Sequence, residues 1–216
     1  MDLIVYDVEL CEEVKKREDW KKINQDWFGC ATVYSYVKNQ YFFFLHQNQL
    51  PALKNFLHNN FTISFNGVNF DSKVILGRER IVSIYNGWST GMLIKNNAIK
   101  WIEYDLFTQC LKGIFNSKDD LEASKRISPG GCKLTDIADA TLRIRKMGDS
   151  AKVPLLYKQK RYGELLAHNL QDVRVTKALF EHVIKHGSLR NGKGQKIVLE
   201  RRGEWFTSCM NILGRK

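Results

Sequence analysis

The sequence predicts an α/β fold, with a mixed five-stranded sheet that starts with three antiparallel strands, continues with parallel β/α units and is flanked by helices. The first observation is a set of short apolar and β-branched runs at residues 3–9, 29–37 and 40–45. A two-residue turn, Lys38-Asn39, joins the last two runs, as in a β-hairpin. The second observation is that strand-like and helix-like segments alternate after residue 50, which is typical of β/α units.

The individual elements follow from local patterns. Residues 12–26 are highly charged and form a loop or a short helix beside the end of the first strand. A helix is predicted at 50–59, where Pro51 lies near the start and Leu53, Phe56 and Leu57 form an apolar stripe. The further predicted strands are 62–65, 100–104 and an edge strand at 196–199, and the further helices follow Asp71 and cover 106–115, 134–142 and 163–185.

Two segments differ from this regular pattern. Residues 81–97 contain the turn signals Asn86-Gly87 and Asn96-Asn97 and receive no assignment. Residues 116–133, with Pro129-Gly130-Gly131, are predicted to be a loop. The strongest helix, 163–185, has Gly187 as its expected stop. We therefore expect one domain over 1–216, with a core at about 1–187 and a basic C-terminal extension at 188–216.

Composition narrows the functional class. The formal net charge of the 216 residues is +11, which favours a phosphate-rich partner. The five cysteines are scattered without CxxC spacing, which argues against a zinc site or a disulfide framework. The chain has no signal-peptide pattern and no apolar run of about 18 residues, the length of a membrane span. We expect a soluble cytoplasmic protein that does not bind membranes.

Carboxylates stand at positions that a fold can bring together. Asp7 and Glu9 are two residues apart near the end of the first strand, so their side chains share one face. Asp71 follows a strand and a turn, where a helix N-cap is the simpler explanation. Asp172 lies inside the longest helix, on the same face as His168. Converging carboxylates suit Mg²⁺ or Mn²⁺, and two such ions about 3.5–4 Å apart can promote phosphoryl transfer.

These residues resemble the motifs of the DEDD (DnaQ-like) 3′–5′ exonucleases, which have a ribonuclease H-like fold. Asp7-Val8-Glu9 matches the first motif, Asp-x-Glu, and the segment from Asn66 to Asp71 matches the second, Asn-x-x-x-Phe-Asp. The third motif is matched by His168 and Asp172, with one departure. In the histidine subclass the base lies five residues before the aspartate, whereas here it lies four before, the spacing of the tyrosine form. The resemblance covers roughly residues 1–200 and is closest to stand-alone bacterial and phage exonucleases.

The resemblance implies an enzyme that hydrolyses DNA or RNA to nucleoside 5′-monophosphates from a single-stranded 3′ end. Two Mg²⁺ or Mn²⁺ ions are expected as cofactors, held by Asp7, Glu9, Asp71 and Asp172. His168 is the expected base, with Tyr162 as an alternative, and Asn66 and Phe70 are expected to contact substrate. A replication protein or helicase is the kind of partner that it implies. Two other interpretations stay open: a nucleic-acid-binding module without activity, and a structure-specific endonuclease.

Two clusters of basic and aromatic residues are candidate contacts for a nucleic-acid strand. One precedes the longest helix and consists of Lys152, Tyr157, Lys158, Lys160 and Arg161. The other follows the first strand and consists of Lys15, Lys16, Arg17, Trp20, Lys21 and Lys22. Solvated charged loops and buried tryptophans explain the same residues equally well, so exposure decides between these interpretations.

Overall fold

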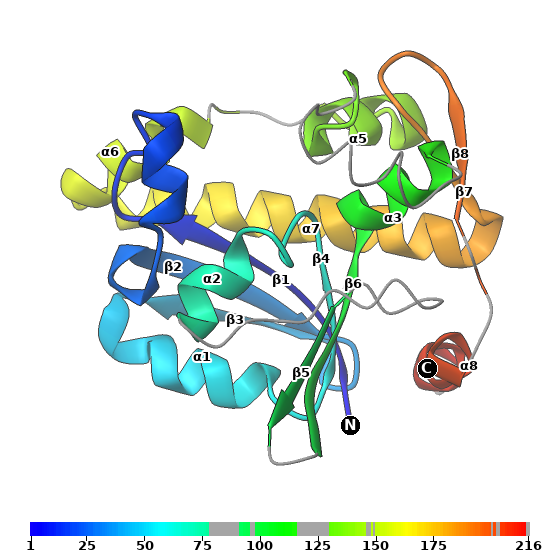
Figure 1. Ribbon diagram of the computed structural model, residues 1–216, viewed down its shortest axis with the longest axis horizontal. Helices are drawn as coiled ribbons and strands as arrows, with labels where there is room; N and C mark the ends of the chain where they lie inside the picture. The colour runs from blue at the N-terminus through cyan, green and yellow to red at the C-terminus, as the bar shows by residue number, and fades with distance from the viewer. Residues whose placement is uncertain are drawn as a thin grey trace.

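The fold is built on one mixed sheet with helices on both faces (Figure 1). The computed structural model describes residues 1–77, 91–95, 98–115, 130–145, 148, 150–199, 201 and 204–214. Within these residues, six strands form the main sheet in the order β3-β2-β1-β4-β6-β5. This is the predicted ribonuclease H-like arrangement, and β5 adds an antiparallel edge strand to the five that the sequence predicts.

The first three strands form the predicted antiparallel meander. They are β1 (Leu3–Leu10), β2 (Phe28–Ser35) and β3 (Gln40–Leu45). β1 pairs with β2 along nearly its whole length, and β2 pairs with β3. The charged segment between β1 and β2 forms two short 3₁₀ helices, η1 (Arg17–Lys21) and η2 (Gln25–Trp27). Asn39 adopts a φ of 50° in the hairpin turn, a conformation that asparagine tolerates well.

Two strands in the second half of the sheet, β4 and β6, run parallel to β1, as the β/α alternation predicts. β4 (Phe61–Ser64) pairs in parallel with both β1 and β6 (Ala98–Asp105), and β6 pairs antiparallel with β5 (Gly91–Lys95). The connecting elements are η3 (Gln47–Gln49), α1 (Leu50–Leu57), α2 (Asp71–Leu76) and α3 (Leu106–Ile114). Most of the unassigned segment 81–97, and residues 116–129 of the predicted loop, lie outside the described residues.

The longest helix, α7 (Tyr162–His186), covers one face of the sheet, and α1 and α2 cover the other (Figure 1). Side chains of β1 alternate between two separate apolar clusters. Leu3 and Val5 pack in the cluster that contains Val173 of α7, whereas Ile4 and Tyr6 pack in the cluster of α1 and α2. Alternation of this kind places every second residue of β1 on the α7 side.

The remaining elements lie beside this core. They are α5 (Leu134–Leu142), η4 (Ser150–Lys152), α6 (Val153–Lys158), β7 (Ser188–Arg190), β8 (Lys196–Val198) and α8 (Glu204–Leu213). β7 and β8 form a separate antiparallel hairpin, so the predicted strand at 196–199 lies outside the main sheet. Leu189, Ile197 and Cys209 of the C-terminal extension are buried in the same cluster as Val173. Among the described residues, every helix falls short of the length and apolar character needed to cross a membrane.

Candidate metal centre

Asp7 and Glu9 lie on the face of β1 that packs against α7, directly after the apolar residues of that face. Leu3 and Val5 precede them on the same face and are fully buried. The pairing of β1 with β2 is irregular between Glu9 and Leu10. Irregularities of this type commonly lie next to functional sites, because they redirect side chains at the end of a strand. β1 therefore delivers two carboxylates towards α7 at the point where the sheet ends.

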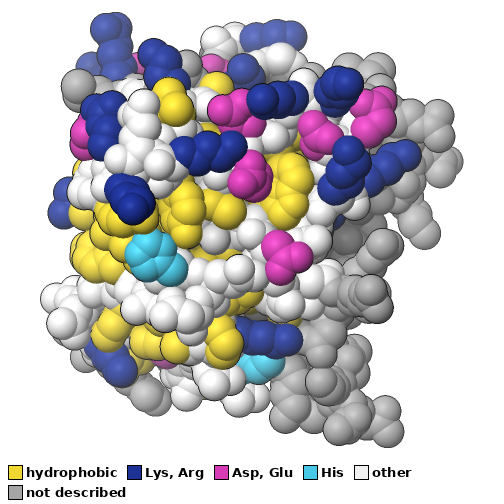
Figure 2. Space-filling view, turned by 90° about the vertical axis from the view of Figure 1, so that its left-hand side faces the viewer, with side chains coloured by type: hydrophobic (Ala, Val, Ile, Leu, Met, Phe, Trp, Pro, Cys, Tyr) yellow, Lys and Arg dark blue, Asp and Glu magenta, His cyan; other side chains and the backbone are white. Residues whose placement is uncertain are grey.

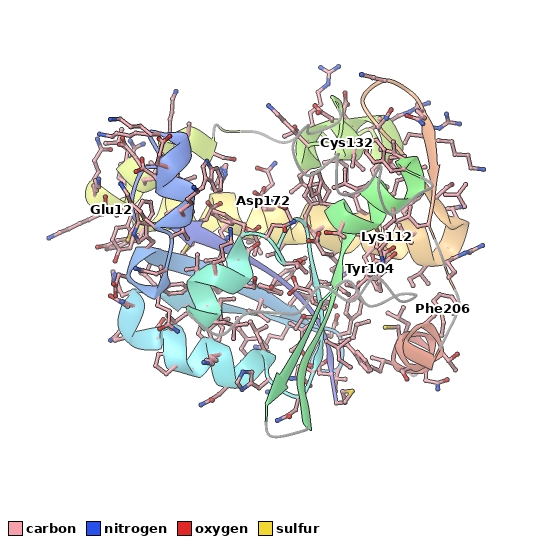
Figure 3. All side chains as sticks on the ribbon, viewed as in Figure 1. Glu12, Tyr104, Lys112, Cys132, Asp172 and Phe206 are labelled. Atoms are coloured by element: carbon pink, nitrogen blue, oxygen red, sulfur yellow. The ribbon has the colours of Figure 1, made fainter. Side chains whose placement is uncertain are left out.

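Helix α7 brings three polar side chains to these carboxylates. Asn169 Nδ2 donates a 2.7 Å hydrogen bond to Asp7 Oδ2, and His168 Nε2 lies 3.6 Å from Glu9 Oε1. Asp172, which is labelled near the middle of α7 in Figure 3, is 6% exposed. Glu9, His168 and Asp172 each offer one ligand atom, and the three atoms lie within 4.8 Å of one another. These three residues are spaced closely enough to approach one cation.

Asp71 is buried at the first position of α2 and is held against β1. Its Oδ1 accepts a 2.9 Å hydrogen bond from the backbone N–H of Val8, the residue between Asp7 and Glu9. The register of β1 with β4 ends at Val5, so Val8 extends beyond that ladder and bonds to a side chain instead. Burial raises the pKa of Asp71, and the negative charges of Glu103 and Glu9 raise it further. The structure thus brings carboxylates from three segments of the chain to one end of β1.

A second layer of buried acids lies behind Asp71, on β6. Glu103 accepts hydrogen bonds from Tyr6 Oη at 2.8 Å and from Ser64 Oγ. Burial, together with the charge of Asp105, raises the pKa of Glu103 to about 8. Glu103 could not be recognised from the sequence, because a single glutamate within a strand belongs to no motif that marks it.

Asp105 organises the turn that leads into α2. Its Oδ1 accepts from the backbone N–H of Asn66 at 2.7 Å, and its Oδ2 accepts from the N–H of Val68 at 3.3 Å. Asp105 also caps α3, because its side chain accepts from the N–H groups of Phe107 and Thr108. One carboxylate therefore connects the start of α3 to the segment that positions Asp71.

The two predicted substrate residues have different surroundings. Asn66 has a φ of 70° and accepts a hydrogen bond from Asn69 Nδ2 at 3.2 Å, as expected for a turn-forming residue. Phe70 lines a cavity next to the carboxylates. Tyr162, the alternative base, contacts His46 and Tyr157 with ring centroids 4.9 and 5.8 Å apart.

The ring of His168 lies close to Gly148, in the segment before α6. Gly148 has a φ of 96°, and a side-chain carbon at this position would lie 3.0 Å from His168 Nδ1. That conformation is accessible to glycine and strained for other residues. Gly148 therefore allows the backbone before α6 to contact the imidazole closely, while Nε2 faces Glu9.

The carboxylates open into a cavity of about 520 Å³. Its walls come from β1, the η1 segment, the turn before α2, η4, α6 and α7, and the lining residues are Asp7, Val8, Glu9, Leu10, Glu12, Glu13, Val14, Lys15, Trp20, Phe70, Ser150, Ala151, Val153, Pro154 and Asp172. Asn169, like Glu103, is a residue of this region that no sequence motif marks. In the structure it is a fully buried polar side chain three residues before Asp172, on the inner face of α7.

Comparison with known proteins adds no identification. No family model matches the chain, and no curated protein matches it.

Glu103 leads to a prediction about stability and pH. Its folded-state pKa of about 8 lies above the value of about 4.3 for an exposed glutamate, so the folded protein binds more protons than the unfolded chain between these values. The protonation of Glu103 therefore contributes to the free energy of unfolding. This contribution is fully present below about pH 4 and is lost by about pH 8, and the free energy of unfolding falls by up to about 1.4 kcal/mol per pH unit between these values. We expect the Tm of wild type to fall more steeply than that of Glu103→Gln between pH 5 and 8, in thermal melts with EDTA. Parallel pH profiles for the two proteins would contradict this prediction.

Proposed function

We propose that this protein is a metal-dependent 3′–5′ exonuclease of the DEDD type, which hydrolyses DNA or RNA to nucleoside 5′-monophosphates. The observation that carries the proposal is the group of Glu9, His168 and Asp172, whose ligand atoms lie within 4.8 Å of one another. Asp7 lines the same cavity as Glu9 and Asp172, and Asp71 bonds to the backbone of Val8 between Asp7 and Glu9. These residues come from three distant segments, and their positions coincide with the three motifs that the sequence resembles.

The donor set fits magnesium or manganese. Carboxylate oxygens dominate it, and hard oxygen ligands suit Mg²⁺ and Mn²⁺. Asp71 has a raised pKa because burial and neighbouring acids oppose its ionisation, and a cation among these groups would offset their repulsion. In this proposal Asp7, Glu9, Asp71 and Asp172 hold two ions. When bound, the ions supply an activated water and stabilise the charge on the leaving oxygen.

The protein's own side chains orient these groups. Asn169 fixes the Asp7 carboxylate, and the backbone N–H of Val8 fixes that of Asp71. Such hydrogen bonds from outside the ligand set typically change metal affinity or activity 10- to 100-fold. His168, in contact range of Glu9, positions the attacking water or accepts its proton.

The charge distribution supports a polyanionic substrate. Figure 2 shows the face that carries α6 and the η1 segment, where Lys and Arg side chains gather along the upper part with Asp and Glu side chains among them. With a net charge of +11, the chain attracts phosphate-rich polymers through long-range electrostatics. The carboxylate cluster therefore lies in a protein whose overall charge brings a phosphodiester to it.

A polarity assay tests the proposal. We expect 5′-labelled DNA or RNA, incubated with Mn²⁺ or Mg²⁺, to yield a progressive ladder of products shortened from the 3′ end. The same reaction with EDTA is expected to leave the substrate intact, and a circular single strand should resist digestion because it has no end. Cleavage of the circle would favour the endonuclease interpretation. Tight binding without metal-dependent products would favour the binding module.

A further inference from the structure

Trp20 is an exposed tryptophan beside the carboxylate cluster. It lies on η1 with 47% of its surface exposed, whereas Trp27 of the same segment packs against the core. The ring of Trp20 makes an edge contact with Phe70, with centroids 5.5 Å apart and planes at 63°. Exposed single aromatics are common on protein surfaces, so the position of Trp20 in the lining of the cavity is the informative observation.

Trp20 and Phe70 form an aromatic wall of the same cavity that contains Asp7, Glu9 and Asp172. The cavity volume of about 520 Å³ falls within the range of roughly 300–1,000 Å³ that is usual for sites of small ligands. The lining of the cavity therefore includes an aromatic pair and a group of carboxylates. A ligand that contacts both needs a flat apolar part for the aromatic pair and a group that approaches the carboxylates.

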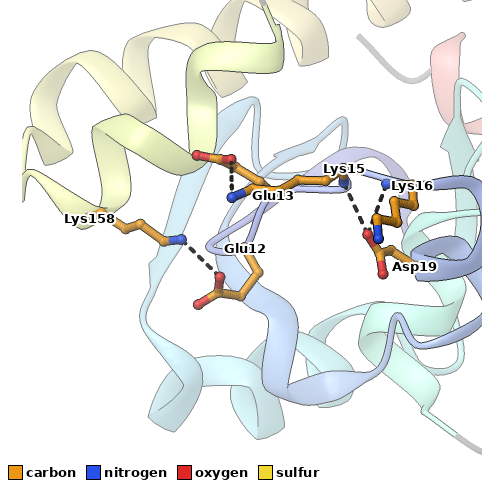
Figure 4. Close-up of polar contacts among 6 residues, drawn as sticks. All are labelled: Glu12, Glu13, Lys15, Lys16, Asp19 and Lys158. Atoms are coloured by element: carbon orange, nitrogen blue, oxygen red, sulfur yellow. Dashed lines mark hydrogen bonds and ion pairs between the residues drawn. The ribbon is translucent and has the colours of Figure 1, made fainter.

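Two acids that line this cavity, Glu12 and Glu13, form ion pairs with lysines (Figure 4). Lys158 Nζ lies 2.9 Å from Glu12 Oε2, and Lys15 Nζ lies 3.4 Å from Glu13 Oε2. Each of these two acids thus has a lysine partner that offsets its negative charge. Lys15 itself is 73% exposed in its side chain and lines the cavity, where it can contact a phosphate of an entering strand.

We propose that Trp20 and Phe70 are a stacking subsite for unpaired bases at the 3′ end of a nucleic-acid strand. This inference rests on the proposed function, because the carboxylate cluster is what makes the end of the strand the occupant. Stacking on an aromatic side chain is worth about 1–3 kcal/mol per base and requires a base that has left the duplex. The subsite therefore selects single-stranded ends over blunt duplex ends, and it accepts any base because every base has a flat face.

Binding measurements on Trp20→Ala test this subsite. We expect its Kd for a 5′-fluorescein-labelled single strand of DNA or RNA, measured by anisotropy with Ca²⁺ in place of Mn²⁺, to rise about 5- to 100-fold. Trp20→Phe keeps a stacking surface and is expected to stay within a few-fold of wild type. Phe43→Ala is the matched control, because Phe43 is a similarly exposed aromatic (46%) on β3 and does not line the cavity. Blunt duplex is expected to bind all four proteins with similar, weaker affinity.

The outcomes separate this inference from the proposed function. Unchanged single-strand affinity in Trp20→Ala, with an unchanged Tm, would overturn the subsite even if wild type hydrolyses nucleic acid. Equal losses for single strand and duplex would overturn it too, since stacking on unpaired bases predicts a selective loss. A selective loss of binding in a protein without nuclease activity would support the subsite and refute the exonuclease.

Discussion

Asp7→Asn is expected to lower the rate of nucleic-acid hydrolysis by about 10³-fold or more at saturating Mn²⁺. The substitution keeps the shape of the side chain and removes the charge that would hold a metal ion. Metal ions contribute several kcal/mol of charge stabilisation to phosphoryl transfer, and each 1.36 kcal/mol corresponds to a factor of ten in rate. The measurement is the initial rate of product formation from a 5′-labelled single strand, together with the affinity for Mn²⁺ by calorimetry.

The control for Asp7→Asn is Asp139→Asn. Asp139 is an exposed aspartate on α5, so its amide variant carries the same change in net charge at a distance from the cavity. We expect Asp139→Asn to keep wild-type activity and both variants to keep the wild-type Tm within a few degrees. Wild-type hydrolysis by Asp7→Asn, in a preparation free of contaminating nuclease, would refute the metal centre.

Gly67→Ala is expected to destabilise the fold by about 3 kcal/mol. A side-chain carbon at Gly67 would overlap Ser64 Oγ and Glu103 Oε1, both of which are buried. Overpacking costs typically 1–3 kcal/mol, and a buried polar group that loses its partner costs about 1–3 kcal/mol more. For a chain of this length the Tm should fall by roughly 6–12 °C, which calorimetry or a thermal melt by circular dichroism measures.

Gly163→Ala provides the matched control for Gly67→Ala. Gly163 lies in the first turn of α7, and a side-chain carbon there has no other atom within 4 Å. Alanine is the better helix former by up to about 1 kcal/mol, so Gly163→Ala should leave the Tm unchanged or raise it. A Tm for Gly67→Ala equal to that of wild type would mean that Ser64 and Glu103 can move apart without loss, and that the buried acid layer is not rigid.

Much of the fold was predictable because its signals are local. The continuous apolar run at residues 3–6 predicts strand β1, and the two-residue period of a strand predicts that Asp7 and Glu9 share a face. The structure confirms both, because Asp7 bonds to Asn169 and Glu9 lies beside His168 on the same helix. The amphipathic pattern of α7 and the glycine at its end likewise predict a helix whose observed C-cap is Gly187. The α8 helix and the separate β7–β8 hairpin were not predicted, since the pairing of short edge strands and the docking of a terminal helix depend on the surface they meet.

The candidate site was likewise predictable from the sequence only in part. Motif spacing identified Asp7, Glu9, Asp71, His168 and Asp172 as a set. It did not identify Asn169, which binds Asp7 across 162 positions of the chain, or Glu103 behind Asp71. These residues act through long-range hydrogen bonds, which have no periodicity and no fixed spacing in the sequence. The sequence also left open whether Trp20 is buried or exposed, because its exposure depends on the residues that pack around it.

The sequence alone predicts the antiparallel meander, the parallel β/α half, the α/β class and the carboxylates at the ends of elements, because backbone periodicity and turn chemistry are properties of neighbouring residues. It does not predict that Asp71 bonds to Val8, that Asn169 holds Asp7, or that Trp20 and Phe70 line the same cavity as Glu9, which are features of the tertiary structure. These contacts join segments that are distant along the chain. They form only when burial of the two apolar clusters brings β1, α2 and α7 together, and that burial is a property of the whole chain.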